Sequence, residues 1–223
     1  MFTVIESNGR TTVTGKFPTT VSKVENQTIT IKANTTAYIF VLAGNALVES
    51  SSLSLPLHFS ISVPGPDTVY INGSAMVVVS EHQHGMFTAS QLETYGRLKY
   101  IDGCHDSLLI PPTRFGEPCL NALYFPPGIE QTAHTHPSLR AGCVVSGEGR
   151  CITEQGITPL VPGTVFLLSE DTKHHFVTLD QAMVVVAYHP DSDFGPKDED
   201  HPMVNRTFVN GIAANAIAEI RTN

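Results

Sequence analysis

Apolar residues along the chain gather in short runs separated by turn residues, and most of these runs are rich in Val, Ile, Thr, Phe and Tyr. Such runs, about 8–12 residues apart, are typical of an antiparallel sandwich or barrel. The predicted strands cover residues 12–17, 27–33, 38–44, 58–63, 68–73, 76–80, 120–125, 141–147, 164–169, 175–179 and 183–189. Helical spacing of apolar residues occurs in 211–220 and, more weakly, in 87–96. The pattern therefore predicts an all-β fold with a short C-terminal helix.

The two halves of the chain share a hydrophobic skeleton. Residues 74–82 (SAMVVVSEH) match residues 181–189 (QAMVVVAYH), and residues 40–44 (FVLAG) match residues 143–147 (CVVSG). The matches keep the same order and nearly the same separation, which favours duplication over coincidence. We therefore predict two similar β-barrel domains, residues 1–95 and 96–223.

Composition and charge narrow the class of protein. At 223 residues, with 41% hydrophobic and 15% charged residues, the chain is of globular type and long enough to bury a sizeable core. The net charge of −8 arises in the second half, so a nucleic-acid backbone would be repelled. The longest apolar run, 37–44, is too short to cross a bilayer, and the first residues lack a signal-peptide pattern. We expect a soluble, cytoplasmic protein with no nucleic-acid or membrane partner.

The four cysteines also lie in the second half, and they are Cys104, Cys119, Cys143 and Cys151. They form no C-x-x-C pair and no spacing typical of structural zinc. We expect buried, reduced thiols.

Histidines in the second half have the spacing of a metal site. His134 and His136 are two residues apart, so on one strand both would project from the same face. His174 begins a later predicted strand that a Greek-key connection would bring alongside. His175 would point to the opposite face. We predict that His134, His136 and His174 bind one metal ion.

This pattern resembles the cupin superfamily. The first cupin motif, G-x5-H-x-H-x3–4-E-x6-G, is matched by Gly128, His134, His136 and Gly147, but Arg140 stands in place of the Glu ligand. The second motif is represented by 162–163 (Pro-Gly) together with His174. The resemblance implies tandem jelly-roll barrels, a bicupin, with the metal in the C-terminal barrel.

The first copy resembles the family in its hydrophobic skeleton alone. Ile31 and Ala33 stand where the H-x-H pair would be, and Asp67 or Thr68 stands where His174 would be. We therefore expect the first barrel to hold no metal and to cover an apolar face of the second, so that no long sheet edge lies exposed.

Arg140 has two possible placements. It either points into the pocket, where its planar fork would hold a substrate carboxylate, or turns outward to pair with Glu130 or Glu148. Strand parity favours the inward placement, and Gly142 on the same face would then leave room for a ligand.

Neutral imidazoles with open coordination positions suit Fe(II), and also Mn, Ni, Co, Zn or Cu. Two-copy cupins that cleave hydroxylated aromatic acids or related enolisable substrates use three-histidine Fe(II) sites. The resemblance thus implies a dioxygenase that acts on a small anionic metabolite, with Fe(II) favoured. The alternatives are a redox-neutral isomerase or lyase, and a non-catalytic small-molecule-binding or structural cupin. Monomer and homodimer are both compatible with the sequence.

The segment after the last predicted strand is acidic and proline-rich. Residues 191–202 begin like a calcium loop, but Pro196 and Pro202 occupy positions that need Gly and Glu. We expect a solvated connection, and the alternative is a lid that carries His189 or His201 as proton carrier. Tyr188 and His189, at the end of the preceding strand, are further candidates for substrate contact.

Overall fold

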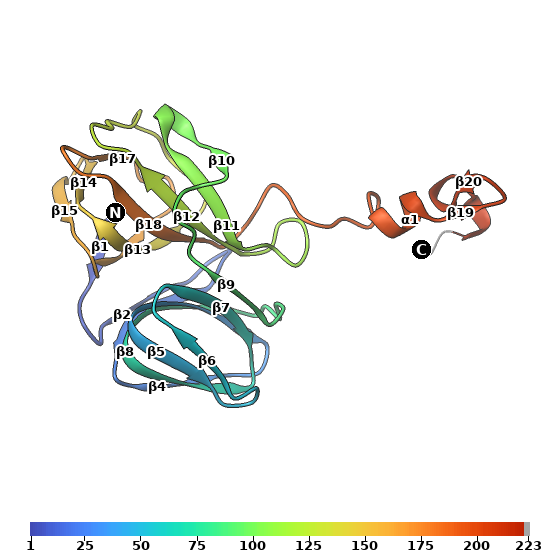
Figure 1. Ribbon diagram of the computed structural model, residues 1–223, viewed down its shortest axis with the longest axis horizontal. Coiled ribbons are helices and arrows are strands. Elements are labelled where there is room, and N and C mark those ends of the chain that lie inside the picture. The colour runs from blue at the N-terminus through green and yellow to red at the C-terminus, as the bar shows by residue number, and fades with distance from the viewer. Residues whose placement is uncertain (221–223) are drawn as a thin grey trace.

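In the computed structural model, which describes residues 1–220, two groups of antiparallel strands are stacked and a C-terminal segment projects from them (Figure 1). The predicted all-β class is confirmed, since strands make up most of the regular structure. The structure also contains strands that the hydrophobic pattern does not predict, because they are short or polar.

The N-terminal group is one sheet in the order β2-β3-β8-β5-β7-β9, with β4 on β8 and β6 on β5. The long strands β5 and β8 pair along nearly their whole length and form its centre. The bounds are β2 (Arg10–Val13), β3 (Thr19–Glu25), β4 (Thr28–Ile31), β5 (Thr35–Val48), β6 (Leu53–Pro56), β7 (Phe59–Pro64), β8 (Asp67–Glu81) and β9 (Thr88–Gln91).

The C-terminal group has a sheet in the order β1-β16-β13-β18-β12-β11-β10 and a smaller sheet in the order β15-β14-β17. The bounds are β1 (Phe2–Ile5), β10 (Leu98–Lys99), β11 (His105–Ile110), β12 (Cys119–Phe125), β13 (Arg140–Gly147), β14 (Gly149–Thr153), β15 (Gly156–Leu160), β16 (Val165–Leu168), β17 (His174–Val177) and β18 (Met183–His189). A 3-10 turn, η1 (Ile101–Gly103), lies between β10 and β11.

The two groups repeat one strand order. The series β2-β3-β8-β5-β7-β9 corresponds, strand by strand, to β11-β12-β18-β13-β16-β1. The strands at the last position come from different parts of the chain. β9 is the last strand of the N-terminal group in chain order, whereas β1, which belongs to the C-terminal group, precedes the whole N-terminal group. β1 pairs antiparallel with β16, and the Phe2 ring stacks on Phe166 at 5.0 Å between centroids.

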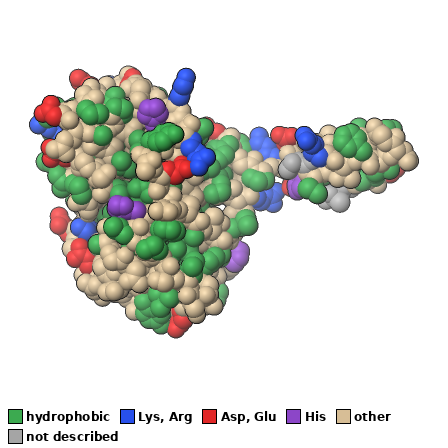
Figure 2. Space-filling view, in the orientation of Figure 1, with side chains coloured by type: hydrophobic (Ala, Val, Ile, Leu, Met, Phe, Trp, Pro, Cys, Tyr) green, Lys and Arg blue, Asp and Glu red, His purple; other side chains and the backbone are tan. Residues whose placement is uncertain are grey.

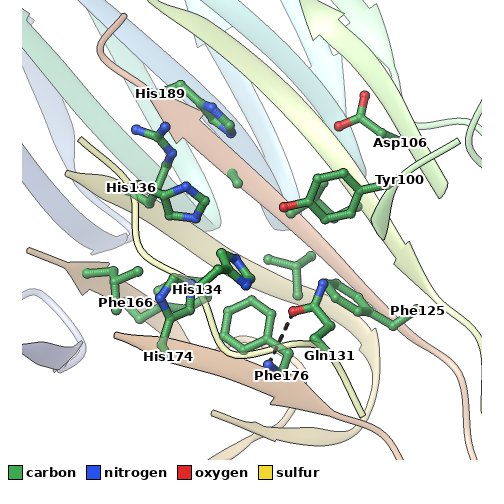
Figure 3. A pocket seen from close by; sticks show the side chains of 15 residues that line it. Tyr100, Asp106, Phe125, Gln131, His134, His136, Phe166, His174, Phe176 and His189 are labelled. Atoms are coloured by element: carbon green, nitrogen blue, oxygen red, sulfur yellow. Dashed lines mark hydrogen bonds between the residues drawn. The ribbon is translucent and has the colours of Figure 1, made fainter. Parts of the chain in front are cut away.

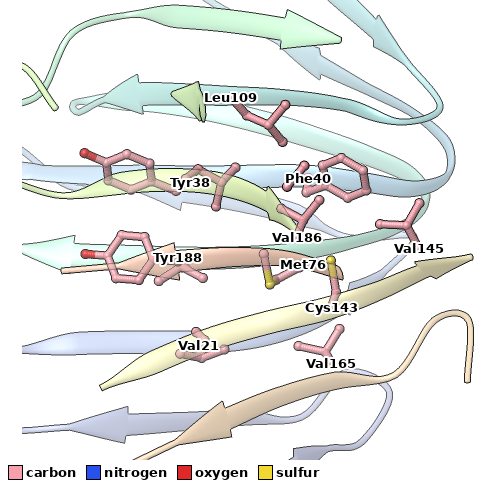
Figure 4. Packing of buried hydrophobic residues seen from close by; sticks show 14 of the residues in the cluster. Val21, Tyr38, Phe40, Met76, Leu109, Cys143, Val145, Val165, Val186 and Tyr188 are labelled. Carbon is pink, nitrogen blue, oxygen red and sulfur yellow. The ribbon is translucent and has the colours of Figure 1, made fainter. Parts of the chain in front are cut away.

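Both groups contribute to a shared core (Figure 4). Tyr38, Phe40 and Met76 from the N-terminal group pack with Val186 and Tyr188 from the C-terminal group, all almost fully buried. Burying each large apolar side chain contributes about 1.5–3 kcal/mol, so the interface is a substantial source of stability. Each group also has a core of its own. The four cysteines are free and buried, as predicted.

The C-terminal segment differs from the predicted helix. Residues 211–220 contain β20 (Ile212–Ala213) and the 3-10 turns η2 (Ala214–Ala216) and η3 (Ala218–Ile220); the short helix α1 (Pro202–Arg206) and β19 (Phe208–Val209) precede them. Most apolar side chains here are exposed, as Figure 2 shows, so no packed face stabilises a longer helix. The second stretch with helical spacing, 87–96, likewise forms no helix. Its residues Thr88–Gln91 form β9, because they pair with β7. Within residues 1–220, no helix has the length and hydropathy of a bilayer span.

Candidate metal centre

Two backbone segments of the C-terminal group bring the three histidines together. The chain from residue 126 to 139 is mostly irregular, in contrast to the strand expected for the H-x-H pair, but it runs antiparallel beside β17. His134 and His174 form an isolated bridge in which each N–H donates to the other's carbonyl at 2.9 Å. The His136 carbonyl accepts from the Asp171 N–H at 2.9 Å, which fixes the next turn.

The three imidazoles form a compact cluster (Figure 3). Their centroids are 4.6 Å apart for His134 and His174, 5.0 Å for His134 and His136, and 5.1 Å for His136 and His174. One ring nitrogen from each lies within 4.8 Å of the others, so the group could hold a metal ion. Within residues 1–220 no second group of this kind occurs.

Hydrogen bonds fix two of the rings in the form that a metal needs. The Nδ1 atom of His134 lies 2.7 Å from the Thr132 carbonyl oxygen, and that of His174 lies 2.9 Å from the Thr172 carbonyl oxygen. A carbonyl oxygen only accepts, so Nδ1 carries a hydrogen, and in the neutral ring the lone pair is therefore on Nε2. This backbone contact is a common means of orienting a metal-binding imidazole.

Burial keeps two of the three imidazoles, those of His136 and His174, neutral. It lowers the pKa of His136 to about 3, with Arg140 and the other two histidines adding repulsion. It also lowers the pKa of His174 to about 4, against the bond to Thr172, which raises it. Three imidazole nitrogen donors without a carboxylate suit a divalent transition ion better than calcium or magnesium. The residues present therefore fit such an ion.

The cavity beside the triad is small and largely apolar. Its volume of about 60 Å³ has room for roughly four to six water-sized groups, since one water needs roughly 10–15 Å³. Its lining comprises Tyr100, Asp106, Leu123, Phe125, Gln131, His134, His136, Arg140, Phe166, Leu168, His174, Phe176, Val185, Ala187 and His189.

Arg140 points inward, as strand parity favours. Its side chain is 13% exposed and lies 3.7 Å from Asp191 Oδ1, and it pairs with neither Glu130 nor Glu148. Its hydrogen bonds use Nη1, which donates to Ser138 Oγ at 2.5 Å and to the Leu139 carbonyl at 2.9 Å. Its buried Nε has no partner among the described residues. The guanidinium is thus anchored on one side and has donor capacity left on the other.

The two remaining candidates, Tyr188 and His189, are adjacent in β18 and therefore lie on opposite faces of the strand. His189 lines the cavity, and burial, followed by repulsion from Arg140 and His136, holds its pKa well below the ordinary value. Tyr188 instead lies on the opposite face, fully buried in the shared core with its ring 5.1 Å from that of Tyr38. The structure therefore does not bring Tyr188 to the triad.

Gly142 has a different role from the one expected. A Cβ atom there would lie 2.5 Å from Phe166 Cζ and 3.0 Å from the Val186 carbonyl oxygen. The missing side chain accommodates the Phe166 ring, which itself lines the cavity, and so does not leave room for a ligand directly.

The hydrophobic pattern missed a polar side of the cavity, formed by Tyr100, Asp106 and Gln131. Asp106 is 9% exposed and accepts from Asn121 Nδ2 at 2.8 and 3.1 Å, and burial raises its pKa. Gln131 Oε1 accepts from the Phe176 N–H at 3.2 Å. A carboxyl two residues before the apolar run 108–110 was the available signal for Asp106.

The first half has no such cluster. Ile31 is buried in the core of the N-terminal group and pairs in register with Asp67. Ile31 is the position that the sequence aligns with His134, and Asp67 is one of the two positions, with Thr68, that it aligns with His174. His134 and His174 bridge each other in the second half. The corresponding backbone contact is therefore present without the imidazoles.

The sequence matches no protein-family model and no curated protein. Solved structures are similar to most of the chain. A cupin 2 conserved barrel domain protein from Leptotrichia buccalis has a TM-score of 0.59 at 12% identity, covering 84% of this chain and 88% of that one. A protein described as glyoxylate-induced, from Pseudomonas aeruginosa, has a TM-score of 0.62 at 14% identity, covering 88% and 82%. The chain has a cupin-like fold.

A salicylate 1,2-dioxygenase from Pseudaminobacter salicylatoxidans is also similar, with a TM-score of 0.58 at 10% identity, covering 78% of this chain and 71% of that one. At this identity the likeness concerns the fold. A cupin-like fold accounts for the way β17 and the irregular segment before β13 converge on one cluster of histidines.

Proposed function

We propose that the chain is a bicupin whose N-terminal barrel has lost its metal ligands and whose C-terminal barrel is the working one. The repeated strand order and the matching contacts of Ile31 with Asp67 and of His134 with His174 support this arrangement. The proposed domains are residues 1–95 and 96–223, with β1 contributed across that division.

The C-terminal cavity, in this proposal, is the active site of a metal-dependent dioxygenase that acts on a small carboxylate-bearing or enolisable molecule. The observation that carries it is a triad of imidazoles in a cavity that also holds an incompletely paired guanidinium. Fe(II) is the favoured ion, and Mn, Ni, Co, Zn or Cu are compatible with the same donors. The likeness to a dioxygenase is consistent with this function but extends only to the fold.

Arg140 binds the substrate carboxylate through Nε, whose hydrogen-bonding capacity is unused, while Nη1 keeps the guanidinium attached to Ser138 and Leu139. A charge-assisted bond of this kind contributes about 1.5–3 kcal/mol in a desolvated site. Phe166 and Phe176 exclude water from the reacting groups. His189, held neutral, accepts or passes a proton at the cavity wall. A bound ion supplies Lewis acidity and, as iron, one-electron chemistry with dioxygen.

The test begins with the metal. Purified protein is stripped by chelation, reloaded anaerobically with Fe(II), and screened for oxygen uptake with hydroxylated carboxylates and diketones. We expect one ion per chain and substrate-dependent uptake, both lost in His136→Ala. The matched control is His175→Ala, because His175 is adjacent to His174 in β17 but does not line the cavity.

Three outcomes count against the proposal. Failure to bind any transition ion would leave a small-molecule-binding or structural role. Turnover without oxygen consumption would favour a redox-neutral isomerase or lyase. A protein that holds stoichiometric zinc as purified, and stays inactive after iron loading, would also contradict a dioxygenase.

A further inference from the structure

The polar side of the cavity holds a second charged group that the metal proposal does not use. Figure 3 shows Asp106 and Tyr100 across the cavity from His136 and His174. Asp106 makes no ion pair within residues 1–220, and its hydrogen bonds come from one amide nitrogen of Asn121. Arg140, in the same cavity lining, pairs with Asp191 instead.

A buried carboxyl group in this setting is costly. Taking a carboxylate out of water costs several kcal/mol unless cations or several donors replace the lost water. Asn121 supplies a single donor nitrogen for both carboxyl oxygens, and its own buried Oδ1 has no partner among the described residues. A hydrophobic residue at position 106 would serve the packing of β11 better, so the structure alone does not account for Asp106.

We propose that Asp106 recognises a hydrogen-bond donor, best a protonated amine, on the same small molecule whose carboxylate Arg140 binds. The inference rests on the proposed function for the location of the carboxylate. It narrows the ligand to a short amino acid, or more weakly a hydroxy acid, because the cavity has room for roughly four to six water-sized groups. Burial raises the pKa of Tyr100, so this side chain remains a neutral phenol beside the Asp106 carboxylate.

Matched pairs of acids test this directly. Glycine and acetate, β-alanine and propanoate, and 4-aminobutanoate and butanoate differ within each pair by the amine alone, and the series varies the span between the charges. Each is titrated by calorimetry into full-length protein loaded with zinc, so that no oxygen chemistry interferes. We expect at least one amino acid to bind 10- to 100-fold more tightly than its partner acid, as one charge-assisted bond implies.

Asp106→Asn should remove that preference and leave the affinity for the partner acid within about twofold of wild type. Glu148→Gln, on the exposed surface, is the control for a lost negative charge and should keep the preference. Because Asp106→Asn removes a buried charge, its thermal midpoint should not fall. If it does, Asp106→Ser provides a second variant that cannot carry the charge.

Equal binding within every pair, or an equal loss for both members of a pair in Asp106→Asn, would overturn the inference. A failure of all six compounds to bind would also overturn it. The two proposals fail separately. Oxygen uptake with no amine preference would support the dioxygenase and contradict the role of Asp106. An amine preference without oxygen uptake would support the role of Asp106 and contradict the dioxygenase.

Discussion

Acidification should destabilise the metal-free protein well before its carboxylates titrate. In the unfolded chain, His136 and His174 take up protons near the ordinary pKa of about 6.5. In the folded protein, their pKa values are lowered to about 3 and about 4, chiefly by burial. Between these limits the unfolded state binds more protons, so the free energy of unfolding falls as pH falls below about 6.5.

The size of the effect follows from the same pKa values. From pH 7 to pH 5, each of the two histidines removes about 2 kcal/mol, and because both are coupled and His136 is partly exposed we expect about 3–4 kcal/mol in total. This is a large share of the roughly 5–15 kcal/mol that stabilises a typical domain. The loss should level off near pH 3–4, where the folded histidines also bind protons.

Urea denaturation of chelator-treated protein at pH 7, 6 and 5 measures this, with circular dichroism as the signal. The double variant His136→Gln/His174→Gln should lose about 3–4 kcal/mol of the pH dependence. The part that remains includes His189, whose pKa burial also lowers, and subtracting the profile of the variant removes it. His175→Gln should keep the wild-type slope. An unchanged midpoint from pH 7 to 5, or an equal slope in the double variant, would refute the argument that these rings are buried and neutral.

Four other predictions concern the cavity and the cores. Arg140→Met should weaken propanoate binding 10- to 100-fold by calorimetry while zinc stoichiometry stays at one, since the guanidinium is not a ligand. Gly142→Ala should lower the free energy of unfolding by about 1–3 kcal/mol in urea, because its Cβ would overlap Phe166. The thiols should resist Ellman's reagent at pH 8 until the protein unfolds, because burial raises the pKa of Cys119 and Cys151 to about 12. Residues 96–223 alone should aggregate or bind zinc poorly, having lost β1 and the shared core, and a fully loaded, soluble fragment would contradict this.

The fold class was predictable because long apolar runs become central strands. Runs such as 76–80 and 183–189 lie in β8 and β18, where both faces are buried, so hydrophobicity alone marks them. The short edge strands were harder to predict. The predicted strand 12–17 overlaps the polar strand β2 by two residues, Thr12 and Val13, and β10, which has two exposed residues, was missed. The C-terminal helix was wrong because periodicity predicts a helix only where its apolar face packs against a partner.

The site was predictable where spacing alone constrains it. His134, His136 and His174 follow a pattern whose backbone contacts bring the imidazoles together. Arg140 followed from strand parity, and the same parity separates Tyr188 from His189 once the register of β18 is known. Asp106 was missed because its approach depends on β11 lying beside β12, a pairing that no local pattern in residues 105–110 encodes.

The pairing of β1 with β16 has a consequence for synthesis. About 160 residues separate Ile5 from its partner Val165, so at roughly 5–20 residues per second the segment Phe2–Ile5 waits roughly 10–30 s before that partner is translated. Throughout that interval, a nascent chain with a completed N-terminal sheet still has an unpaired β-prone segment, Phe2–Ile5. Slow translation would prolong the exposure of these few residues, and a chaperone that shields them would protect them. Both would therefore affect how much of the newly made chain reaches the state in which the histidines converge.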